Sequence, residues 1–595
     1  MESVSSFISL KTPQLFYTIA GAFKTLPGLW KDEQIASHAK VTERVHAAGG
    51  KIAAQLYHAG RETTSEITEV QPIAPSAVKE QSMSEIPREL TIEEIHELVE
   101  QFGDAAERAK KAGFDAVEMH GAHGYLIGAF VSPLSNLRHD KYGGSITNRA
   151  RFAVEILQNI RKKCGEEFPV IYRMSTVEYA HGGLAIEEAK TVAMILEDAG
   201  IDAIHCSKGI YVSTHAIIPS SIVPRAAYVD NAATIKSVVD IPVIAVGRIN
   251  DPGIAESVIV SGKADLVAMG RASLADPMLP KKTAEGREDE IIRCIGCVQG
   301  CVGEHVTGRY TRCLVNPVTG MLDEYDLTPT KAPKTVLVIG GGISGCETAI
   351  AAALKGHKVT LAEKTGKLGG QWVQASIPIG KSEFTSLINW QTNELRRLGV
   401  EIRMNILDDK KLIEKTNPDI LVAATGSRPI IPSIPGSSKA HVKTAHEVLN
   451  GDVPVGKHAV VIGGGLIGAE TADWMAEQGA KVTMIEMLPE IVKDGEHTPN
   501  KYLKERLAEY QVDIYTSTEV TEIRDDCVIA RKGENCIEIS DVDMVVMAVG
   551  VEKALPEDKI FDSFQGRVIY VGDARTVKNG FKNMLEAFET GLKID

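Results

Sequence analysis

The sequence predicts an α/β chain made of a (β/α)8 or TIM barrel that lacks its first strand, an iron–sulfur loop, and two Rossmann-like nucleotide-binding domains. Three observations indicate this organisation. Strand-like and helix-like runs alternate from about residue 50 to residue 275, as in a parallel sheet with helical crossovers. Four closely spaced cysteines follow, and two glycine-rich motifs come after them, each behind an apolar run.

The barrel is predicted from six apolar runs and a weaker seventh near the N-terminus. The runs are KIAAQLY (51–57), FDAVEMH (114–120), PVIYRMS (169–175), IDAIHCS (201–207), IPVIAVG (241–247), ADLVAMG (264–270) and the weaker SSFISL (5–10). Between the first two, Thr91 and Glu94 form a capping-box pair, and apolar residues recur at helical spacing until Gly113. A closed (β/α)8 barrel needs eight strands, so the sequence predicts a barrel with one strand missing.

Polar side chains gather where the predicted strands end. They are Gln55, His58, His120, His123, Arg173, Lys208, Arg248 and Arg271. The carboxyl ends of barrel strands form the catalytic face, which makes these residues candidates for a binding site. For any one of these residues taken alone, a solvated loop residue is the favoured interpretation, but their recurrence on strand after strand favours a shared site.

The four cysteines stand in the order Cys294-x2-Cys297-x3-Cys301-x11-Cys313. Three thiolates in one tight loop, with a fourth from a short excursion, are typical of an iron–sulfur cluster. Structural zinc sites usually carry paired C-x2-4-C motifs, so zinc is a less favoured alternative, and unligated thiols are a third. The position of the group between the barrel and the nucleotide motifs predicts an electron relay.

Composition excludes several classes of partner. The 595 residues are 44% hydrophobic and 24% charged, as in a globular protein of about three or four domains. The net charge of −14 argues against a nucleic acid or an anionic membrane. No apolar stretch reaches the length of a membrane span, and the cysteines outside the group are scattered without a disulfide framework. A cytoplasmic, reducing location is therefore expected.

Two Rossmann motifs follow the linker TPTKAPK (328–334). In each, an apolar strand leads into a GxGxxG turn and a helix, and the next strand ends in an acid suited to a ribose hydroxyl. The glycines let a pyrophosphate approach the helix N-terminus. The first motif comprises Gly340, Gly342, Gly345 and Glu363, and the second comprises Gly463, Gly465, Gly468 and Glu486. An acid rather than an arginine in the second motif favours NADH over NADPH.

Over nearly its whole length the chain resembles the flavin-dependent ene reductases of the 2,4-dienoyl-CoA reductase and 2-enoate reductase type, whose barrel is similar to Old Yellow Enzyme. The resemblance is carried by the cysteine group, the tandem fingerprints and several short motifs. These motifs are AQLYHAGR (54–61), the segment from 113 to 149 with its HGAHGYL, IYRMS, AVGRI, AMGR, GKLGGQW (366–372), AATGSRP (423–429) and YVGDAR (570–575).

The resemblance implies four segments. An FMN-binding barrel covers residues 1–290 with its first strand missing, and a 4Fe–4S segment with a linker covers 291–333. An FAD-binding domain covers 334–450 and is completed by 551–595, around an NAD(H)-binding domain at 451–550. NADH delivers two electrons as hydride and a cluster carries one at a time, so a flavin is needed on each side of the cluster. The implied path runs from NADH through FAD, the cluster and FMN to the substrate.

The resemblance also implies roles for single residues. His120, His123 and Tyr125 match the family's substrate motif, with the histidines polarising a carbonyl and Tyr125 acting as general acid. His215 follows a later strand and is either an assisting residue or a loop histidine. The expected FMN contacts are Gln55 and Arg173 for the ring and Gly247, Gly270 and Arg271 for the phosphate. The further FAD contacts are expected at Gly370, Gln371, Gly426 and Asp573.

Members of this family carry an opening strand upstream of the point where this chain begins. Three explanations compete: a misassigned start, a fragment, or a rearrangement of the remaining strands. Unpaired edges are unfavourable in a buried parallel sheet, which favours the first two, and they should weaken FMN binding.

The leading hypothesis is an NADH-dependent reductase of an activated C=C bond in a small unsaturated acid, ketone or acyl-CoA. The same chemistry in reverse gives a 3-oxo-steroid or bile-acid-CoA desaturase, and an amine dehydrogenase is less favoured because of the histidine pair. A different class of hypothesis is an electron-transfer module, or incomplete enzyme, unable to hold FMN. The cluster predicts oxygen sensitivity and an anaerobic host, and the resemblance leaves a homo-oligomer open.

Overall fold

A seven-stranded parallel sheet organises the first part of the chain in this computed structural model, which describes residues 3–9, 27–407, 409–493, 495–555 and 560–595. The strand order is β1-β2-β5-β6-β7-β8-β9. The bounds are β1 Ser3–Ser9, β2 Lys51–Tyr57, β5 Ala116–Gly121, β6 Val170–Ser175, β7 Ala203–Ser207, β8 Val243–Ala245 and β9 Leu266–Val267. Each of the seven lies on a predicted run, although Leu10 of the first run is outside the described residues.

The sheet is open at β1 and β9 within the described part of the chain, where no eighth strand joins it. All six strand pairs are parallel, and the first joins Ser3 to Lys51 through Ser9 to Tyr57. The predicted fold class, a barrel-type parallel sheet short of one strand and followed by nucleotide-binding domains, is therefore confirmed.

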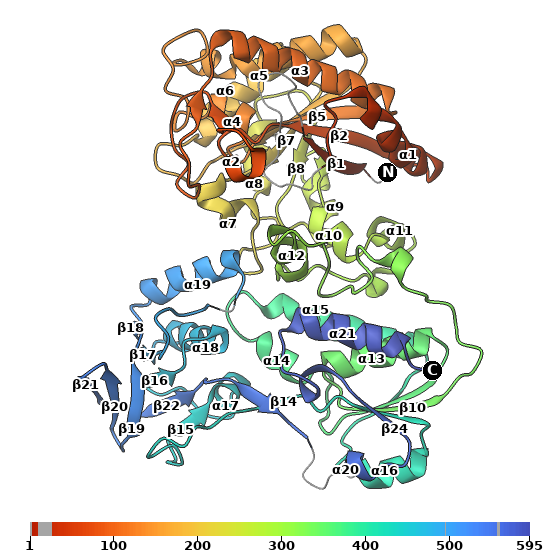
Figure 1. The fold of residues 1–595 in the computed structure, drawn as a ribbon, viewed down its shortest axis with the longest axis vertical. Helices are drawn as coiled ribbons and strands as arrows, with labels where there is room; N and C mark the ends of the chain where they lie inside the picture. Colours follow the sequence, from red (N-terminus) through yellow and green to blue (C-terminus); the bar gives the residue numbers. More distant parts are fainter. Residues whose placement is uncertain (1–2, 10–26, 408, 494, 556–559) are drawn as a thin grey trace. The chain divides into compact units, whose positions relative to one another are not determined.

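In its described residues the first part of the chain has nine helices, the longer of which lie around this sheet (Figure 1). They are α1 Ile35–Ala47, α2 Ser65–Thr68, α3 Ile92–Lys111, α4 Leu126–Val131, α5 Ile146–Cys164, α6 Ile186–Asp198, α7 Thr214–Ile217, α8 Val229–Lys236 and α9 Pro252–Val260. A short parallel pair, β3 Ile73–Ala74 and β4 Arg88–Glu89, precedes α3. The predicted capping box is present, with the Glu94 N–H donating to Thr91 Oγ1 at 3.2 Å and the Thr91 N–H donating to Glu94 Oε2 at 2.9 Å.

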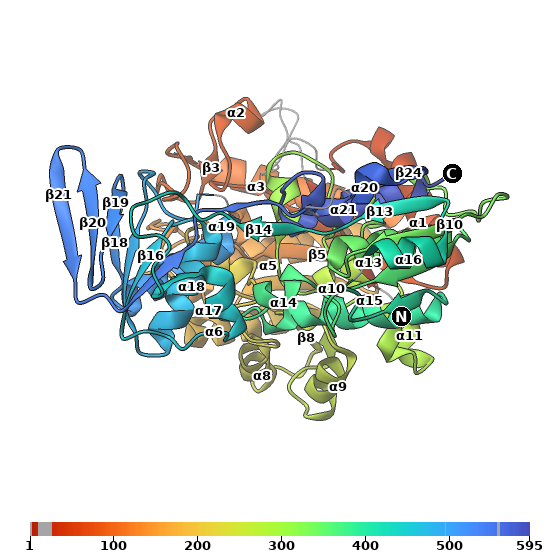
Figure 2. The same ribbon diagram turned by 90° about the horizontal axis from the view of Figure 1, so that it is seen from below.

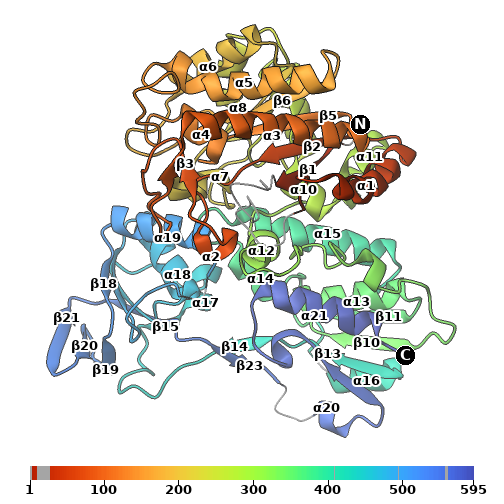
Figure 3. The same ribbon diagram turned by 45° about the horizontal axis from the view of Figure 1, so that its top comes forward.

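The core of this part lies between the sheet and its helices. Helices α3 and α5 run side by side (Figure 3), and α3 packs against β2 and β5. Their facing apolar stripes meet at Phe102 and Phe152, whose ring centroids are 6.2 Å apart, and Phe130 of α4 packs 4.4 Å from Phe152. All three rings are fully buried.

The chain divides into two compact units. The first comprises residues 1–219 and 224–270, and the second comprises 220–223 and 271–595. Helix α10 (Gly270–Ala275) begins at the last residue of the first unit, and the second unit continues with α11 Leu279–Ala284, the cysteine segment and α12 Glu304–Val306. The cysteines thus belong to the same unit as the nucleotide motifs.

Two further parallel sheets form most of the second unit. The first has the order β12-β11-β10-β13-β24 and the second β15-β22-β16-β17-β18. The first comprises β10 Thr335–Ile339, β11 Lys358–Ala362, β12 Glu401–Arg403, β13 Ile420–Ala423 and β24 Arg567–Tyr570, with helices α13 Ile343–Leu354, α14 Gln371–Ala375, α15 Thr385–Arg397, α16 Asp409–Thr416, α20 Ile560–Ser563 and α21 Gly580–Leu592. The second comprises β15 Val442–Thr444, β16 His458–Ile462, β17 Lys481–Ile485, β18 Asp513–Tyr515 and β22 Met544–Met547, with α17 Ala445–Asn450, α18 Leu466–Glu477 and α19 His497–Glu509.

Two small antiparallel sheets complete the second unit. Strands β19 Glu519–Ile523, β20 Cys527–Lys532 and β21 Asn535–Ser540 extend beside the second nucleotide sheet (Figure 2). Strands β14 Ser427–Pro429 and β23 Val551–Lys553 pair where the chain leaves and re-enters the first nucleotide sheet. Residues 567–570 form β24, which pairs with β13 and so belongs to the first sheet, although the strands of the second sheet lie between the two in the sequence. The described residues contain no helix long and apolar enough to cross a membrane.

The aromatic core between α3, α4 and α5 should dominate the stability of the first unit. Replacing Phe152 by alanine removes a fully buried ring and should lower the free energy of unfolding by about 3–5 kcal/mol. The matched control is Val260→Ala on α9, where the side chain is 75% exposed and the change should stay within about 0.5 kcal/mol. Urea denaturation followed by circular dichroism measures both, and equal effects would contradict this view of the core.

Candidate active site

The loop that follows β5 brings three candidate residues together. His120 lies at the end of the strand, His123 and Gly124 have left-handed backbone with φ of +62° and +85°, and Tyr125 is the N-cap of α4. The ring centroids of His120 lie 5.0 Å from those of His123 and 4.9 Å from those of Tyr125, and His123 and Tyr125 are 6.5 Å apart. The spacing HxxHxY therefore produces one cluster of three rings.

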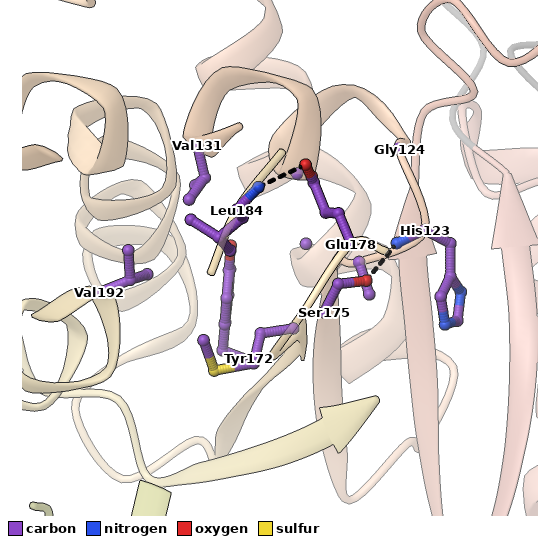
Figure 4. A pocket seen from close by; sticks show the side chains of 12 residues that line it. His123, Gly124, Val131, Tyr172, Ser175, Glu178, Leu184 and Val192 are labelled. Atoms are coloured by element: carbon purple, nitrogen blue, oxygen red, sulfur yellow. Dashed lines mark hydrogen bonds between the residues drawn. The ribbon is translucent and has the colours of Figure 1, made fainter. Parts of the chain in front are cut away.

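Hydrogen bonds from two neighbouring strand ends hold this loop in place. The backbone N–H of His123 donates to Ser175 Oγ at 2.9 Å (Figure 4), and Ser175 Oγ donates to the Gly209 carbonyl at 2.8 Å. The ring Nε2 of His123 lies 2.7 Å from Ser207 Oγ. These bonds stabilise a left-handed backbone that costs a non-glycine residue about 1–3 kcal/mol. Neither serine was predicted, because no sequence pattern connects them to the loop.

Both histidines of the cluster are neutral. Burial lowers the pKa of His120 and His123 well below the ordinary value, and the nearby Arg173 and His205 lower it further. His120 Nδ1 accepts a hydrogen bond from the Ala122 N–H at 3.2 Å, which leaves the ring proton on Nε2. The pair can therefore donate hydrogen bonds without carrying charge.

Tyr125 keeps its proton and has a phenolic partner. Its hydroxyl oxygen lies 2.9 Å from that of Tyr211, and burial followed by this neighbour raises the pKa of Tyr125 well above its usual range. Tyr211 was not predicted. His215 was predicted to follow a later strand, which is β7. It lies on α7, four residues beyond Tyr211. A phenol in this state is suited to act as an acid.

Beside this cluster, buried polar side chains from several neighbouring strands are joined by hydrogen bonds. Glu118 accepts hydrogen bonds from Gln55 Nε2 and from His205 Nδ1, the latter at 2.8 Å. Burial opposes the ionisation of Glu118, but His205, Arg173 and Gln55 outweigh it and hold the pKa of Glu118 below its ordinary value. Glu118 and His205 were missed, although Glu118 lies two residues before His120 and thus on the same side of β5.

The strand ends fit a flavin ring. The buried polar atoms that have no hydrogen-bond partner in the described part of the chain include three at these strand ends: Gln55 Oε1, Arg173 Nε and His205 Nε2. They lie on neighbouring strands, with Gln55 opposite Glu118, and Arg173 opposite both His120 and His205. The edge of an isoalloxazine ring both donates and accepts hydrogen bonds, so it can satisfy such atoms. Leaving them unpaired would cost about 1–3 kcal/mol each.

The glycines predicted at the flavin phosphate follow the last two strands. Gly247 has φ of +122°, and a Cβ there would lie 2.7 Å from the Tyr228 ring, so only glycine is tolerated. Gly270 begins α10 and has open space around it, with no heavy atom within 4 Å of an added Cβ. Arg271 is the next residue and belongs to the second unit.

The four predicted cluster ligands gather in one place in the second unit. Cys294, Cys297 and Cys313 pack beside Ile295 and Leu314. Burial raises the pKa of Cys297 well above the ordinary value, and the nearby thiols of Cys301, Cys313 and Cys294 raise it further. Within the described residues, no group of three or more histidine, cysteine or acidic side chains is placed to hold a metal ion.

The two nucleotide motifs have the same internal geometry. The Gly341 N–H donates to Glu363 Oε2 at 2.7 Å, and the Gly464 N–H donates to Glu486 Oε2 at 2.6 Å. The second oxygen of each acid accepts from a backbone N–H two residues further on. Each acid therefore lies against its glycine turn, at the end of the second strand where the sequence analysis placed it.

The glycines of both turns leave the cradle that a pyrophosphate needs. A Cβ on Gly345 would lie 1.9 Å from the Gly340 carbonyl oxygen, and one on Gly468 would lie 2.0 Å from that of Gly463. No atom lies within 4 Å of an added Cβ at Gly342, or at Gly465 in the second turn. The third glycine of each motif thus permits helix packing, while the second leaves open space at the helix N-terminus.

The further predicted FAD residues come together from three segments. Gln371 Nε2 donates to the Ser427 carbonyl at 2.7 Å, and Ser427 Oγ donates to Asp573 Oδ2 at 2.7 Å. Gly426 has φ of +76°, and a Cβ there would lie 3.8 Å from Gln371 Nε2; Gly370 has φ of +52° beside Gly342. Ser427, which links the set, was not predicted.

Comparison with known proteins identifies the chain. Residues 15–290 match the NADH:flavin oxidoreductase / NADH oxidase family, and residues 334–560 match pyridine nucleotide-disulphide oxidoreductase. An NADH oxidase from Thermoanaerobacter brockii is 42% identical over 577 residues, covering 95% of this chain and 87% of that protein. The chain belongs to the NADH:flavin oxidoreductase family.

Other members of this family resemble the chain over most of its length. A cinnamate reductase from Clostridium sporogenes is 38% identical over 578 residues, covering 93% of this chain and 86% of that protein. The structure of a 2-naphthoyl-CoA reductase in complex with 2-naphthoyl-CoA superposes with a TM-score of 0.91 at 30% identity, covering 97% of this chain and 90% of that one. This NADH:flavin oxidoreductase is an enzyme of the ene-reductase kind, with FMN, FAD and NAD(P) as the cofactors of its two matched regions.

Alanine substitutions at Gly342 and Gly345 should distinguish an effect on folding from an effect on cofactor binding. Gly345→Ala forces a Cβ against the Gly340 carbonyl and should lower both the unfolding midpoint and the FAD content. Gly342→Ala meets no protein atom, so the unfolding midpoint of the apoprotein should stay unchanged while the FAD content falls. Differential scanning calorimetry and flavin analysis measure the two effects. Full FAD in the Gly342→Ala protein would refute a pyrophosphate at this turn.

Proposed function

We propose that this NADH:flavin oxidoreductase reduces a C=C bond conjugated to the carbonyl of an acid, a ketone or an acyl-CoA. The observation that carries the proposal is the cluster of His120, His123 and Tyr125 beside the buried strand ends, in which the histidines have a lowered pKa and the phenol has a raised pKa. The names of two relatives, a cinnamate reductase and a 2-naphthoyl-CoA reductase, support an aryl-substituted unsaturated acid or thioester as substrate.

The two histidines would bind the substrate carbonyl. His120 offers Nε2–H, since its Nδ1 accepts from the Ala122 N–H. A Ser207 hydroxyl that donates to His123 Nε2 leaves the proton of that ring on Nδ1, the polar atom that can face a ligand. Two fixed donors aimed at one oxygen stabilise the negative charge that develops there when hydride reaches the distal alkene carbon. Each such donor typically contributes about 2.7–4 kcal/mol.

FMN supplies the hydride when it is bound, and Gln55 and Arg173 are the residues that would hold its ring. Tyr125 would then deliver the proton to the alkene carbon next to the carbonyl. Its high pKa keeps the phenol protonated until an enolate, a stronger base, is formed. Gly247, Gly270 and Arg271 would hold the phosphate, and His215 remains a candidate for substrate contact on α7. The same residues would serve the reverse desaturation, whose direction depends on the equilibrium with the electron acceptor.

Electrons are proposed to pass from NADH through FAD and a 4Fe–4S cluster to FMN. The gathering of Cys294, Cys297, Cys301 and Cys313 supports this path. Burial and repulsion between neighbouring thiolates raise the pKa of Cys297, and bound iron would stabilise the thiolates by neutralising their charge. A four-iron cluster is larger than one ion, so its ligands stand further apart than those of a zinc site. Glu486 at the second motif supports NADH as the donor.

Tyr125→Phe tests the general acid. The substitution keeps the ring and removes the hydroxyl, so the rate of alkene reduction should fall by about 10²- to 10⁴-fold. Reduction of ferricyanide by NADH, which needs no proton transfer to carbon, should keep its rate. The matched control is Tyr142→Phe, a tyrosine of the same unit whose hydroxyl donates to Glu155 at 2.7 Å. An undiminished alkene rate in the Tyr125 variant would exclude this role.

Cys297→Ala tests the cluster. We expect about four irons and four acid-labile sulfides in the protein purified without oxygen, and a large loss of both in the variant. Cys536→Ala is the control, because this exposed cysteine lies outside the group. FAD content should not change in either variant. Stoichiometric zinc, or iron that is unaffected by Cys297→Ala, would rule out the proposed cluster.

A further inference from the structure

A small cavity lies beside the loop that carries His123 (Figure 4). Residues 121–124 of this loop form one wall, and α4, β6 and α6 contribute others through Gly128, Tyr172 and Val192. The room inside is close to what one water molecule needs. The cavity can therefore hold a molecule of about that size and no larger ligand.

Two buried polar side chains line this cavity, and each can form a further hydrogen bond. Tyr172 on β6 is 1% exposed, and its hydroxyl has no hydrogen-bond partner in the described part of the chain. Glu178, in the loop after β6, is 3% exposed and accepts from Ser132 Oγ at 2.7 Å and from the Leu184 N–H at 2.8 Å. Both bonds end on Oε2, so Oε1 of Glu178 can accept from another donor.

The unpartnered hydroxyl of Tyr172 indicates what fills the cavity. A buried hydroxyl without a partner is unfavourable, because it has lost its bonds to solvent and gained none from the protein. The hydroxyl lies close to Gly121, where an added Cβ would be 2.1 Å from it, so the glycine leaves room for the phenol. The apolar lining side chains, which include Val131, Met174 and Leu184, offer the hydroxyl no acceptor.

A water molecule has the hydrogen-bonding groups that this cavity requires. Cavities that stay dry in proteins are lined by apolar groups, whereas ordered water occupies those with polar partners. Water can accept from the hydroxyl of Tyr172 and donate to Oε1 of Glu178, which satisfies both groups at once. The two side chains reach the same cavity from β6 and from the loop that follows it (Figure 4).

Glu178 also connects segments that surround the candidate catalytic residues. Its carboxylate accepts from Ser132, the C-cap of α4, and Tyr125 is the N-cap of the same helix. Its backbone carbonyl accepts from Ser213 Oγ at 2.6 Å. Tyr211, two residues before Ser213, is the phenol whose hydroxyl lies 2.9 Å from that of Tyr125. A displacement of Glu178 would therefore disturb both α4 and the segment of Tyr211.

We propose that the cavity binds one ordered water molecule between the Tyr172 hydroxyl and Glu178 Oε1, and that Tyr172 thereby positions the loop of His123. The hydroxyl donates to the water, and the water donates to the carboxylate. Tyr172 is a positioning residue, because it acts through the water and Glu178. The water site stands on the cavity and its two polar groups, whereas its effect on alkene reduction rests on the proposed function of His123 and Tyr125.

Crystallography of the holoenzyme tests the site directly. One ordered density peak should lie within hydrogen-bond distance of Tyr172 Oη and Glu178 Oε1. The peak should be lost in Tyr172→Phe, which keeps the ring and removes the hydroxyl. An empty cavity in the wild-type protein, a Tyr172 hydroxyl bonded directly to the protein, or a peak that is unchanged in the variant would each overturn the water site.

The unfolding midpoint gives a second measurement, whose sign separates a filled cavity from a dry one. If the hydroxyl of Tyr172 binds water, Tyr172→Phe should lower the midpoint by about 2–4 °C in differential scanning calorimetry. If the hydroxyl has no partner, its removal should leave the midpoint unchanged or raise it, and that result would contradict the proposal.

Turnover tests the positioning role. In Tyr172→Phe, kcat for alkene reduction should fall about tenfold, since small displacements of catalytic groups slow the chemical step, while FMN content and the reduction of ferricyanide by NADH stay unchanged. Tyr142→Phe is the control: this fully buried tyrosine donates to Glu155 at 2.7 Å and lies outside the cavity lining, so the variant should lose stability but keep kcat.

The possible failures can be distinguished. An unchanged kcat in Tyr172→Phe, with the water lost, would overturn the positioning role and leave the water site in place. An equal fall of kcat in Tyr142→Phe would show that general loss of stability, rather than the water, slows the enzyme. Full activity in Tyr125→Phe would instead refute the general acid, a result on which the crystallographic test of the water does not depend.

Discussion

The backbone hydrogen bond from His123 to Ser175 is the contact on which the candidate active site depends. It holds a non-glycine residue in left-handed backbone, and that turn makes His120, His123 and Tyr125 face one another instead of alternating along a strand. Ser175 and Ser207 belong to the next two strands, so the parallel pairing of β5, β6 and β7 sets the distance between the loop and its supports. The geometry of the rings is thus a property of the sheet as much as of the motif.

Charge is distributed unevenly around this site for a physical reason. Burial raises the pKa of Glu62 well above its ordinary value, whereas His205, Arg173 and Gln55 outweigh burial and hold the pKa of Glu118 below its ordinary value. The same residue type therefore has pKa shifts of opposite direction at two buried positions. The nearby charges and the hydrogen-bond donors, more than burial, separate the two cases, since both side chains are almost wholly buried.

The second unit contains two glycine turns with the same geometry. Each glycine turn is held by the acid that follows the next strand, and each leaves open space at its second glycine. The pairing of β24 with β13 means that the first nucleotide sheet is completed by the end of the chain. A sheet finished in this way ties the C-terminal segment to the fold, and it brings Asp573 to Ser427 and Gln371.

The sequence by itself determined the fold class and the position of every strand of the first sheet, because alternation of apolar runs with helical patterns is a local property. Strand ends were less well determined. The predicted runs at 241–247 and 264–270 are longer than the observed strands Val243–Ala245 and Leu266–Val267, because the chain leaves the sheet before Gly247 and Gly270. The ring cluster and the glycine turns were also evident, because their residues are close in sequence.

Only the tertiary structure decided which distant residues support that cluster. Ser207 lies 84 positions from His123, Tyr211 lies 86 from Tyr125, and His205 lies 87 from Glu118. No spacing rule connects such pairs, because the sheet rather than the chain makes them neighbours. The raised pKa of Glu62 is of the same kind, since it depends on burial and on the charge of Glu178, which is distant in sequence. The sequence determines which groups are available, and the packing of strands determines which of them carry charge.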